Sequence, residues 1–88
     1  MSIESILNLI IGGETDELEL KSNLKDSGLL ARLISSFANT KGGKIIVGAE
    51  ENGNIVGVNK SIINRIYDSA LDRLSPKPNT TLNFVQTD

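Results

Sequence analysis

One stretch of the sequence decides the fold: Phe37-Ala38-Asn39-Thr40-Lys41-Gly42-Gly43-Lys44-Ile45-Ile46-Val47-Gly48. It predicts the end of a helix, a glycine turn and the start of a strand. Asn39 and the pair Gly42-Gly43 tolerate a positive φ angle, which favours the end of a helix before them. Residues 45–47 are β-branched, too few for a helix and bounded by glycines, which is typical of a strand buried on both faces.

The residues before this stretch have an apolar pattern with helical spacing. One face of the predicted helix carries Leu29, Leu30, Leu33, Ile34 and Phe37. Residues 17–21 instead alternate polar and apolar side chains, which predicts a strand buried on one face. The inward side chains of this strand are Leu18 and Leu20, and its outer face carries Glu17, Glu19 and Lys21. We therefore expect a helix packed on a sheet.

Two further strands are predicted after this region. Asn52-Gly53 predicts a hairpin, because both residues accept the positive φ angle that a type I′ turn demands. Residues 55–58 would form the second strand of this hairpin. Residues 81–88 have the pattern of a last strand, and no partner strand follows them.

Two further helices are expected at either side of the central region. The first covers residues 1–13, is capped by Ser2 and is ended by Gly12-Gly13. Its apolar face would pack on the domain or on a second copy of the chain, and binding to a membrane surface is the alternative. The second covers residues 62–74 and is stopped by the proline-containing segment that follows.

Composition limits the function. Nine basic and eleven acidic residues among 88 give a net charge of −2, so nucleic-acid binding must rely on a local basic surface. The absence of cysteine is compatible with a reducing cytoplasm, where we expect the protein to be located. The absence of histidine excludes imidazole-based serine or cysteine catalysis and histidine-ligated zinc. No apolar run approaches the roughly 20 residues that span a bilayer.

Four segments resemble, in order, the motifs of the Schlafen AlbA_2 domain family. They are residues 14–21, 36–43, 45–48 and 53–58. This family has been described as a DNA-binding domain and, earlier, as a divergent AAA-type ATPase domain. No Gly-Lys-Ser/Thr follows a spaced glycine here, so the sequence gives the ATPase description no support. The resemblance implies an α+β fold with a small mixed, mainly antiparallel sheet packed by helices.

The resemblance also implies a domain organisation. An N-terminal amphipathic helix over residues 1–13 would precede an AlbA_2-like domain over residues 14–88. The family domain usually continues past this point, so a truncated C-terminal end is one explanation of the unpaired last strand. Family members are commonly the N-terminal part of longer bacterial regulators, so a downstream domain would be expected in a longer chain.

A nucleic-acid-binding module is the first functional hypothesis. Lys41 and Lys44 flank Gly42 and Gly43, and glycines let a backbone approach a phosphate closely. Lys21 would add a further positive charge. The simpler explanation is that the glycines only turn the chain. The module would bind DNA or RNA as part of a bacterial transcriptional regulator or defence protein.

A metal-dependent ribonuclease is the alternative. The animal Schlafens that cut transfer and ribosomal RNA use two glutamates five residues apart and a later acid, and the resemblance matches Glu14 and Glu19 to the pair and Glu51 to the third. Carboxylates converging in this way would suit Mg²⁺ or Mn²⁺. Lys21 could then neutralise the scissile phosphate. The simpler explanation is a solvated strand face and an ordinary hairpin shoulder.

A third hypothesis needs no chemistry, because the N-terminal helix could pair with a copy of itself. The protein would then be a homodimeric scaffold or dimerisation module. No cofactor is expected for the binding module or the scaffold, and only the nuclease would require a metal ion.

Overall fold

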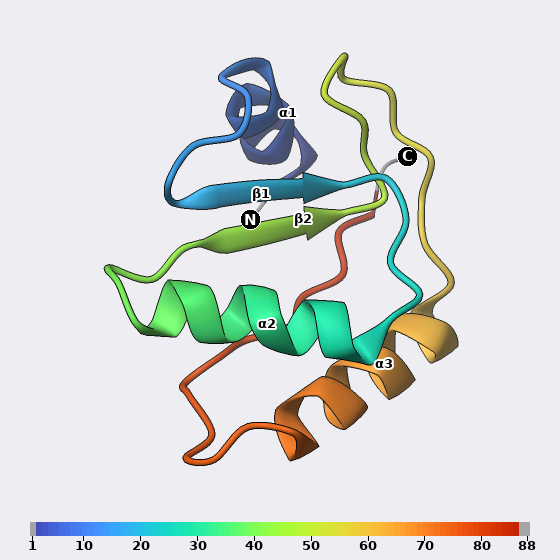
Figure 1. The fold of residues 1–88 in the computed structure, drawn as a ribbon. Helices are drawn as coiled ribbons and strands as arrows, with labels where there is room; N and C mark the ends of the chain where they lie inside the picture. The colour runs from blue at the N-terminus through green and yellow to red at the C-terminus, as the bar shows by residue number, and fades with distance from the viewer. Residues whose placement is uncertain (1, 87–88) are drawn as a thin grey trace.

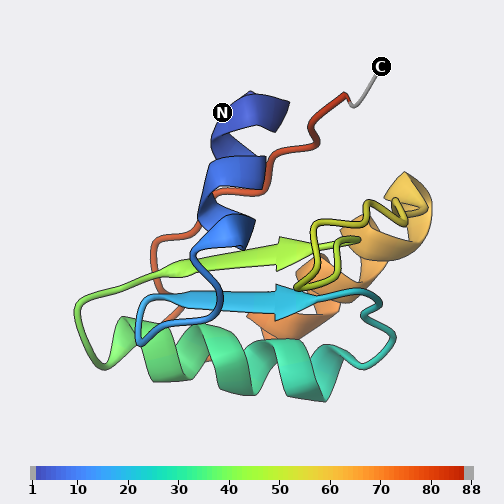
Figure 2. The same ribbon diagram turned by 90° about the horizontal axis from the view of Figure 1, so that it is seen from above.

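Two adjacent strands lie between helices in the computed structural model of the chain, which describes residues 2–86 (Figure 1). The elements are α1 (Ile3–Ile11), β1 (Leu18–Lys21), α2 (Ser27–Ala38), β2 (Lys44–Val47) and α3 (Lys60–Asp72). Helix α1 covers one face of the sheet, and α2 and α3 lie against the other (Figures 1 and 2). Within the described residues, no helix is long and apolar enough to cross a membrane.

The sheet is parallel, so the prediction of a mainly antiparallel sheet is wrong. Leu18 faces Lys44, and Lys21 faces Val47 at the other end of the two strands. The reason is the connection between the strands, because the 12 residues of α2 return the chain to the end from which β1 started. The order of strand, helix and strand that the sequence predicted is therefore the order of a parallel crossover unit.

The chain turns back where the hairpin was predicted, but the turn differs and a single bridge stands in place of the second strand. An antiparallel bridge joins Ala49 to Ile55. A type I′ turn requires a positive φ angle at both Asn52 and Gly53. Gly53 has a φ angle of 91°, but Asn52 does not have a positive φ angle, since every residue among 2–86 that has one is a glycine. Instead the Asn52 side chain accepts a hydrogen bond of 2.9 Å from the Asn54 N–H. Asparagine stabilises this turn through its side chain rather than through its backbone.

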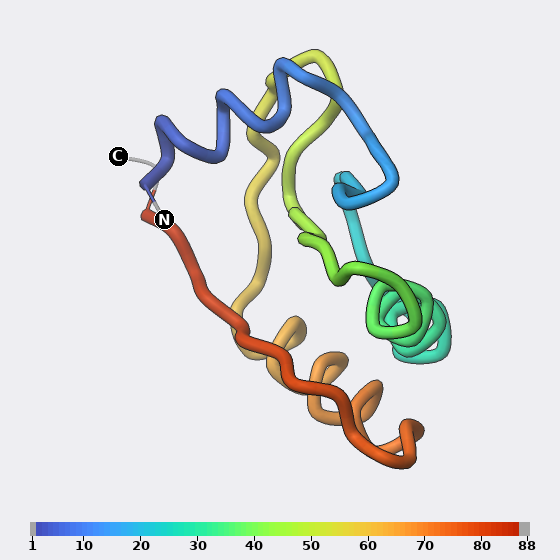
Figure 3. Tube along the Cα trace, turned by 90° about the vertical axis from the view of Figure 1, so that its left-hand side faces the viewer, coloured from blue at the N-terminus to red at the C-terminus, as the bar shows by residue number. Residues whose placement is uncertain are grey.

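The other two strands expected from the sequence are absent from the described residues. Residues 56–58 and 81–86 belong to no strand, and Ile55 contributes the single bridge. Residues 87–88, the end of the last predicted strand, lie outside the described residues. Residues 78–86 instead run past the sheet on the side of β2 (Figure 3).

Polar caps fix where the helices begin. The Ser2 hydroxyl accepts a hydrogen bond from the Ser5 N–H at 3.1 Å, and Gly12 follows the last residue of α1, so both predicted ends are confirmed. The Asn59 side chain accepts from the Ile62 N–H, and α3 therefore begins at residue 60, two residues before the predicted start. Helix α2 is followed by Asn39 with a negative φ of −84°, so the positive φ angle is supplied by Gly42 instead.

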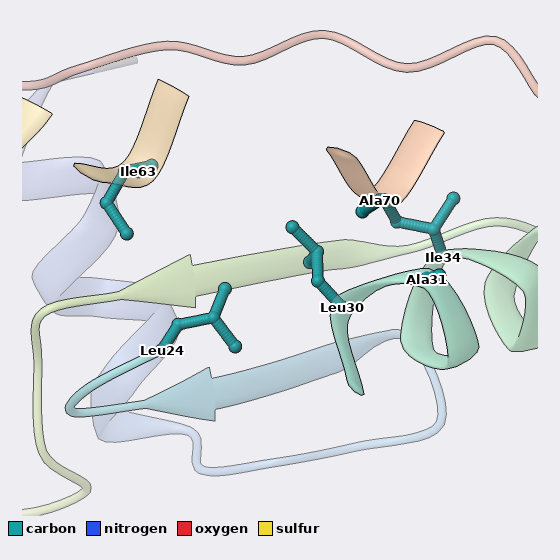
Figure 4. Packing of buried hydrophobic residues seen from close by; sticks show 6 residues of the cluster. All are labelled: Leu24, Leu30, Ala31, Ile34, Ile63 and Ala70. Carbon is teal, nitrogen blue, oxygen red and sulfur yellow. The ribbon is translucent and has the colours of Figure 1, made fainter. Parts of the chain in front are cut away.

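The core has two parts, one on each face of the sheet. Leu30, Ala31 and Ile34 of α2 pack with the buried residues Leu24, Ile63 and Ala70 (Figure 4). Ile10 of α1 packs on the other face with the buried residues Leu18, Leu20 and Ala49. Residues 45–47 are half-buried and contact both parts of the core. Ile46 packs with the part that contains α1, whereas Ile45 and Val47 pack with the part that contains α2 and α3. Both faces of β2 are covered, as predicted.

Candidate nucleic-acid interface

Glu14 stands beside the outer edge of β1. Its Oε2 accepts a hydrogen bond from the Leu20 N–H at 3.0 Å. The Leu18 N–H, which points to the same edge, donates to the Thr15 carbonyl at 3.3 Å. An unpaired strand edge is a site for association with other chains, so the segment before β1 protects this edge. Glu14 therefore has a structural role that the sequence did not predict.

Glu14 also lies within reach of two other predicted site residues. Lys21 Nζ lies 3.1 Å from Glu19 Oε2. The hydrogen bond from the Leu20 N–H lowers the pKa of Glu14 below its ordinary value, and the Glu19 side chain and the charge of Lys21 act in the same direction. The structure thus brings together two carboxylates and one ammonium group, and the lowered pKa means that these contacts favour the charged form of Glu14.

Glu51 does not join this group. It is exposed in the loop of residues 50–54 that follows β2. Within residues 2–86, no three acidic, histidine or cysteine side chains lie close enough to hold a metal ion together. Glu14 and Glu19 alone would suit Mg²⁺ or Mn²⁺, because these ions usually take one or two carboxylates from the protein and keep several waters.

Lys41 and Lys44 are both exposed, and they flank the turn between α2 and β2. Gly42 has a φ angle of 88°, and its N–H donates to the Phe37 carbonyl at 2.9 Å. Gly43 is required by packing, since a Cβ there would stand 2.6 Å from the Phe37 ring and 2.8 Å from the Glu17 carbonyl oxygen. The turn is thus fixed by contacts with the fold, and its two lysines are held at the start of β2.

The three predicted lysines do not share one end of the sheet. Lys21 faces Val47 at the end of the strands, and Lys44 faces Leu18 at their start. Because side chains alternate along a strand, Lys21 belongs to the face covered by α2, and Lys44 belongs to the face covered by α1. The structure places Lys41 and Lys44 together and places Lys21 with Glu19 elsewhere.

Two arginines and Asp26 lie near Gly28 at the start of α2. The Nη1 atoms of Arg32 and Arg73 lie 3.7 and 3.6 Å from the position that a Cβ of Gly28 would occupy. The ion pairs within the described residues involve Lys21 and Lys77, so neither guanidinium group is neutralised by one. Arg73 was not singled out from the sequence, since it comes close to Arg32 only through the packing of α3 on α2.

The structure is that of a small α/β domain built on one strand–helix–strand unit, with basic side chains at both ends of its sheet. The family model described as Schlafen, AlbA_2 matches residues 14–88. The chain therefore belongs to the Schlafen AlbA_2 family, as its motifs predicted. No curated protein and no solved structure matches the chain.

Proposed function

We propose that this chain is a nucleic-acid-binding module that contacts the phosphate backbone. The observation that carries the proposal is the exposed turn of residues 41–44, where two lysines stand on a rigid support and neither takes part in an ion pair within the described residues. Membership of the Schlafen AlbA_2 family is consistent with this activity. The larger protein would be a bacterial transcriptional regulator or a defence protein.

The proposed contact is electrostatic and does not depend on the base sequence. Lys41 and Lys44 would pair with phosphate oxygens, and the backbone of Gly42 and Gly43 would allow close approach. Lys21 is not part of this contact, because it lies at the other end of the strands, on the opposite face of the sheet, and forms an ion pair with Glu19. Base stacking is not part of the proposal, because Phe37 packs against Gly43.

Reversing the two charges of the turn tests the proposal. The double substitution Lys41→Glu and Lys44→Glu should weaken binding to all sequences alike, and the slope of log K against log salt should fall by about two, since two phosphate contacts are lost. Fluorescence anisotropy with labelled duplex DNA and with transfer RNA, each over a range of salt concentrations, measures both quantities.

A matched control is Lys77→Glu, which reverses another exposed charge. Lys77 Nζ lies 3.2 Å from Asp72 Oδ1, away from the turn. This control should retain most of the binding. The single variant Lys41→Glu changes the net charge by the same amount as this control. Equal losses in these two variants would mean that only net charge matters, and the proposed interface would then be wrong.

A second function is favoured by the meeting of Glu14, Glu19 and Lys21. In a metal-dependent ribonuclease, Glu14 and Glu19 would hold Mg²⁺ or Mn²⁺. Glu51, the third ligand proposed from the sequence, lies apart from them and would have to move to join them. The metal would lower the pKa of a bound water and stabilise charge on the phosphate. Lys21 would offset the charge of the scissile phosphate from the same strand face as Glu19.

The ribonuclease is tested by Glu19→Gln, which keeps the shape of the side chain and removes its charge. Cleavage of labelled transfer RNA in Mn²⁺ should disappear, and the melting temperature should stay close to that of the unmodified protein. Glu51→Gln, measured beside it, decides whether the third acid takes part. Cleavage that persists in Glu19→Gln, or that EDTA does not stop, excludes this function.

A further inference from the structure

Acidic residues are absent from one continuous part of the sequence. Residues 27–49 contain no aspartate and no glutamate, although the whole chain has eleven acidic residues. The same part carries Arg32, Lys41 and Lys44. It forms helix α2, the glycine turn and strand β2, so a chain with a net charge of −2 has a basic region in the middle of its fold. Such a region attracts anions locally even where the net charge of the protein is negative.

The exposed side of α2 connects the two ends of this region. Arg32 and Ser36 of α2 and Asn39 at its end are all exposed, and intervals of four and three residues place them on one side of the helix. The buried residues Leu30 and Ile34 occupy the other side. In Figure 1 the green turn after α2 lies at one end of the helix, and the segment that arrives from β1 lies at the other. A ligand lying along the exposed side therefore reaches from Arg32 to the turn without passing an acidic residue of α2.

A second arginine reaches the N-terminal end of α2 from helix α3. The Nη1 atoms of Arg32 and Arg73 lie 3.7 and 3.6 Å from the position that a Cβ of Gly28 would occupy, and both residues are exposed. Neither guanidinium group takes part in an ion pair within residues 2–86. Two positive groups held this close repel one another. A phosphate between them would offset the repulsion and accept charge-assisted hydrogen bonds from both.

Two acidic side chains lie near the arginines, and both have other partners. Asp26 Oδ1 lies 3.1 Å from the same position at Gly28, and it accepts a hydrogen bond of 2.8 Å from the Gly28 N–H. Asp72, the neighbour of Arg73, forms an ion pair with Lys77 at 3.2 Å. Two arginines against the one carboxylate of Asp26 leave this end of α2 with an excess of positive charge.

The turn at the other end of α2 also has an excess of positive charge. Glu17 is beside it, and the Glu17 carbonyl accepts a hydrogen bond of 2.8 Å from the Lys44 N–H. The Glu17 side chain forms no ion pair with either lysine of the turn in the described part of the chain. We call the exposed side of α2 together with its two ends the basic face; its residues are Arg32, Ser36, Asn39, Lys41, Lys44 and Arg73.

The length and composition of the basic face favour a duplex. Helix α2 has 12 residues and is about 18 Å long. Each strand of a duplex carries a phosphate about every 3.4 Å along the axis, so the basic face matches about five consecutive phosphates. A duplex holds its phosphates at fixed spacing, which suits charges held at the two ends of a rigid helix. Binding of single strands relies instead on aromatic stacking, and the basic face has no aromatic residue, since Phe37 packs against Gly43.

We propose that the basic face binds the backbone of a nucleic-acid duplex lying along α2, with Arg32 and Arg73 as a second phosphate contact. This proposal rests on the proposed function, because Lys41 and Lys44 form the first contact. It adds the direction in which the nucleic acid lies, the extent of the contact and a preference for duplexes. Once one end of the basic face is bound, the other end meets the same backbone at a high effective concentration, so the two contacts reinforce each other.

Neutralising the two arginines tests the second contact. In the variant Arg32→Gln with Arg73→Gln, the slope of log K against log salt for a duplex DNA of about 16 base pairs should fall by about two, since two charges no longer meet phosphates. The variant Arg32→Lys with Arg73→Lys keeps both charges and should keep the slope. Fluorescence anisotropy over a range of salt concentrations measures the slopes, and thermal unfolding followed by circular dichroism verifies that each variant is folded.

A matched control changes the net charge by the same amount away from the basic face. The control is Lys60→Gln with Arg65→Gln. Lys60 begins α3, at the other end of this helix from Arg73, and lies 5.5 Å from the centre of the Phe84 ring. Arg65 is exposed and follows the buried Ile63 by two residues, which turns it to the other side of α3. The control should keep the slope of the unmodified protein.

The preference for duplexes gives a second measurement. The unmodified protein should bind the duplex more tightly than either of its separated strands at the same salt concentration, and the variant with two glutamines should lose most of this preference. Equal or tighter binding of the single strands by the unmodified protein overturns the proposal.

The salt slopes separate this proposal from the proposed function. If the glutamine substitutions leave the slope unchanged while the double substitution at Lys41 and Lys44 lowers it, the second contact is wrong and the proposed function stands. An equal fall in the control variant also overturns the second contact, because only net charge would then matter. If neither pair of substitutions changes the slope, both proposals are wrong.

Discussion

Replacing Gly48 by alanine is expected to lower the free energy of unfolding by about 2–5 kcal/mol. Gly48 has a φ angle of 94°, which costs an L-residue roughly 1–2 kcal/mol. In addition, a Cβ would stand 2.9 Å from the Gly57 carbonyl oxygen and 2.9 Å from Val58 Cγ1. Relieving such contacts costs about 1–3 kcal/mol more.

The neighbours of Gly48 have little freedom to move away. Its N–H donates to the Lys21 carbonyl at 2.8 Å, and its own carbonyl accepts hydrogen bonds from Val56 and Gly57 at 2.8 and 2.9 Å. The residue therefore joins β1, the end of β2 and residues 56–57 at one point. A shift there would weaken all three connections together.

Gly53→Ala is the matched control for this prediction. Gly53 has a similar φ angle of 91°, but a Cβ there would meet no atom within 4 Å. It should lose only about 1–2 kcal/mol, and the effect of alanine on the unfolded chain is similar for both variants and cancels in the comparison. Urea unfolding of the two variants measures the difference. Equal losses would show that the close contact at Gly48 does not constrain the fold.

Local features of the fold could be predicted because each depends on neighbours in the sequence. The buried side of α2, the cap at Ser2 and the inward direction of Leu18 and Leu20 all follow from spacing within one element. Whether the strands are parallel or antiparallel depends on which strands pair with each other. The prediction of an antiparallel sheet assumed that the hairpin at Asn52-Gly53 would supply the main strand pair. Asn52-Gly53 does turn the chain, but the strand it returns forms only one bridge.

The same distinction applies to the candidate site. Glu14, Glu19 and Lys21 are close in sequence, and the structure brings them together. The position of Glu51 and the separation of Lys21 from Lys44 depend on strand register, which the spacing of motifs does not contain. The C-terminal segment also differs from the prediction, because the sequence predicted a strand and the structure has none among residues 81–86.

Truncating Ile10 to alanine should also lower the free energy of unfolding by about 2–5 kcal/mol, through lost burial and the cavity that remains. Ile10 is 1% exposed and packs with Leu18, Leu20 and Ala49 on the sheet. The family model begins at residue 14, so Ile10 lies before the matched range and packs on residues inside it. We therefore expect helix α1 to unfold together with the sheet, so that truncation destabilises the sheet as well as the helix.

The next residue provides the control, because Ile11 belongs to the same helix and is 80% exposed. Ile11→Ala removes the same atoms from water-exposed surface and adds a better helix former, so its effect on stability should lie within about 0.5 kcal/mol of zero. Thermal and urea unfolding distinguish the two variants. A small loss for both would mean that α1 docks weakly on the sheet, and its apolar face would then be free to pair with a second copy. A large loss for Ile10 alone means that this face is occupied within one chain, so any homodimer through α1 has to use the side of the helix that carries Ile11.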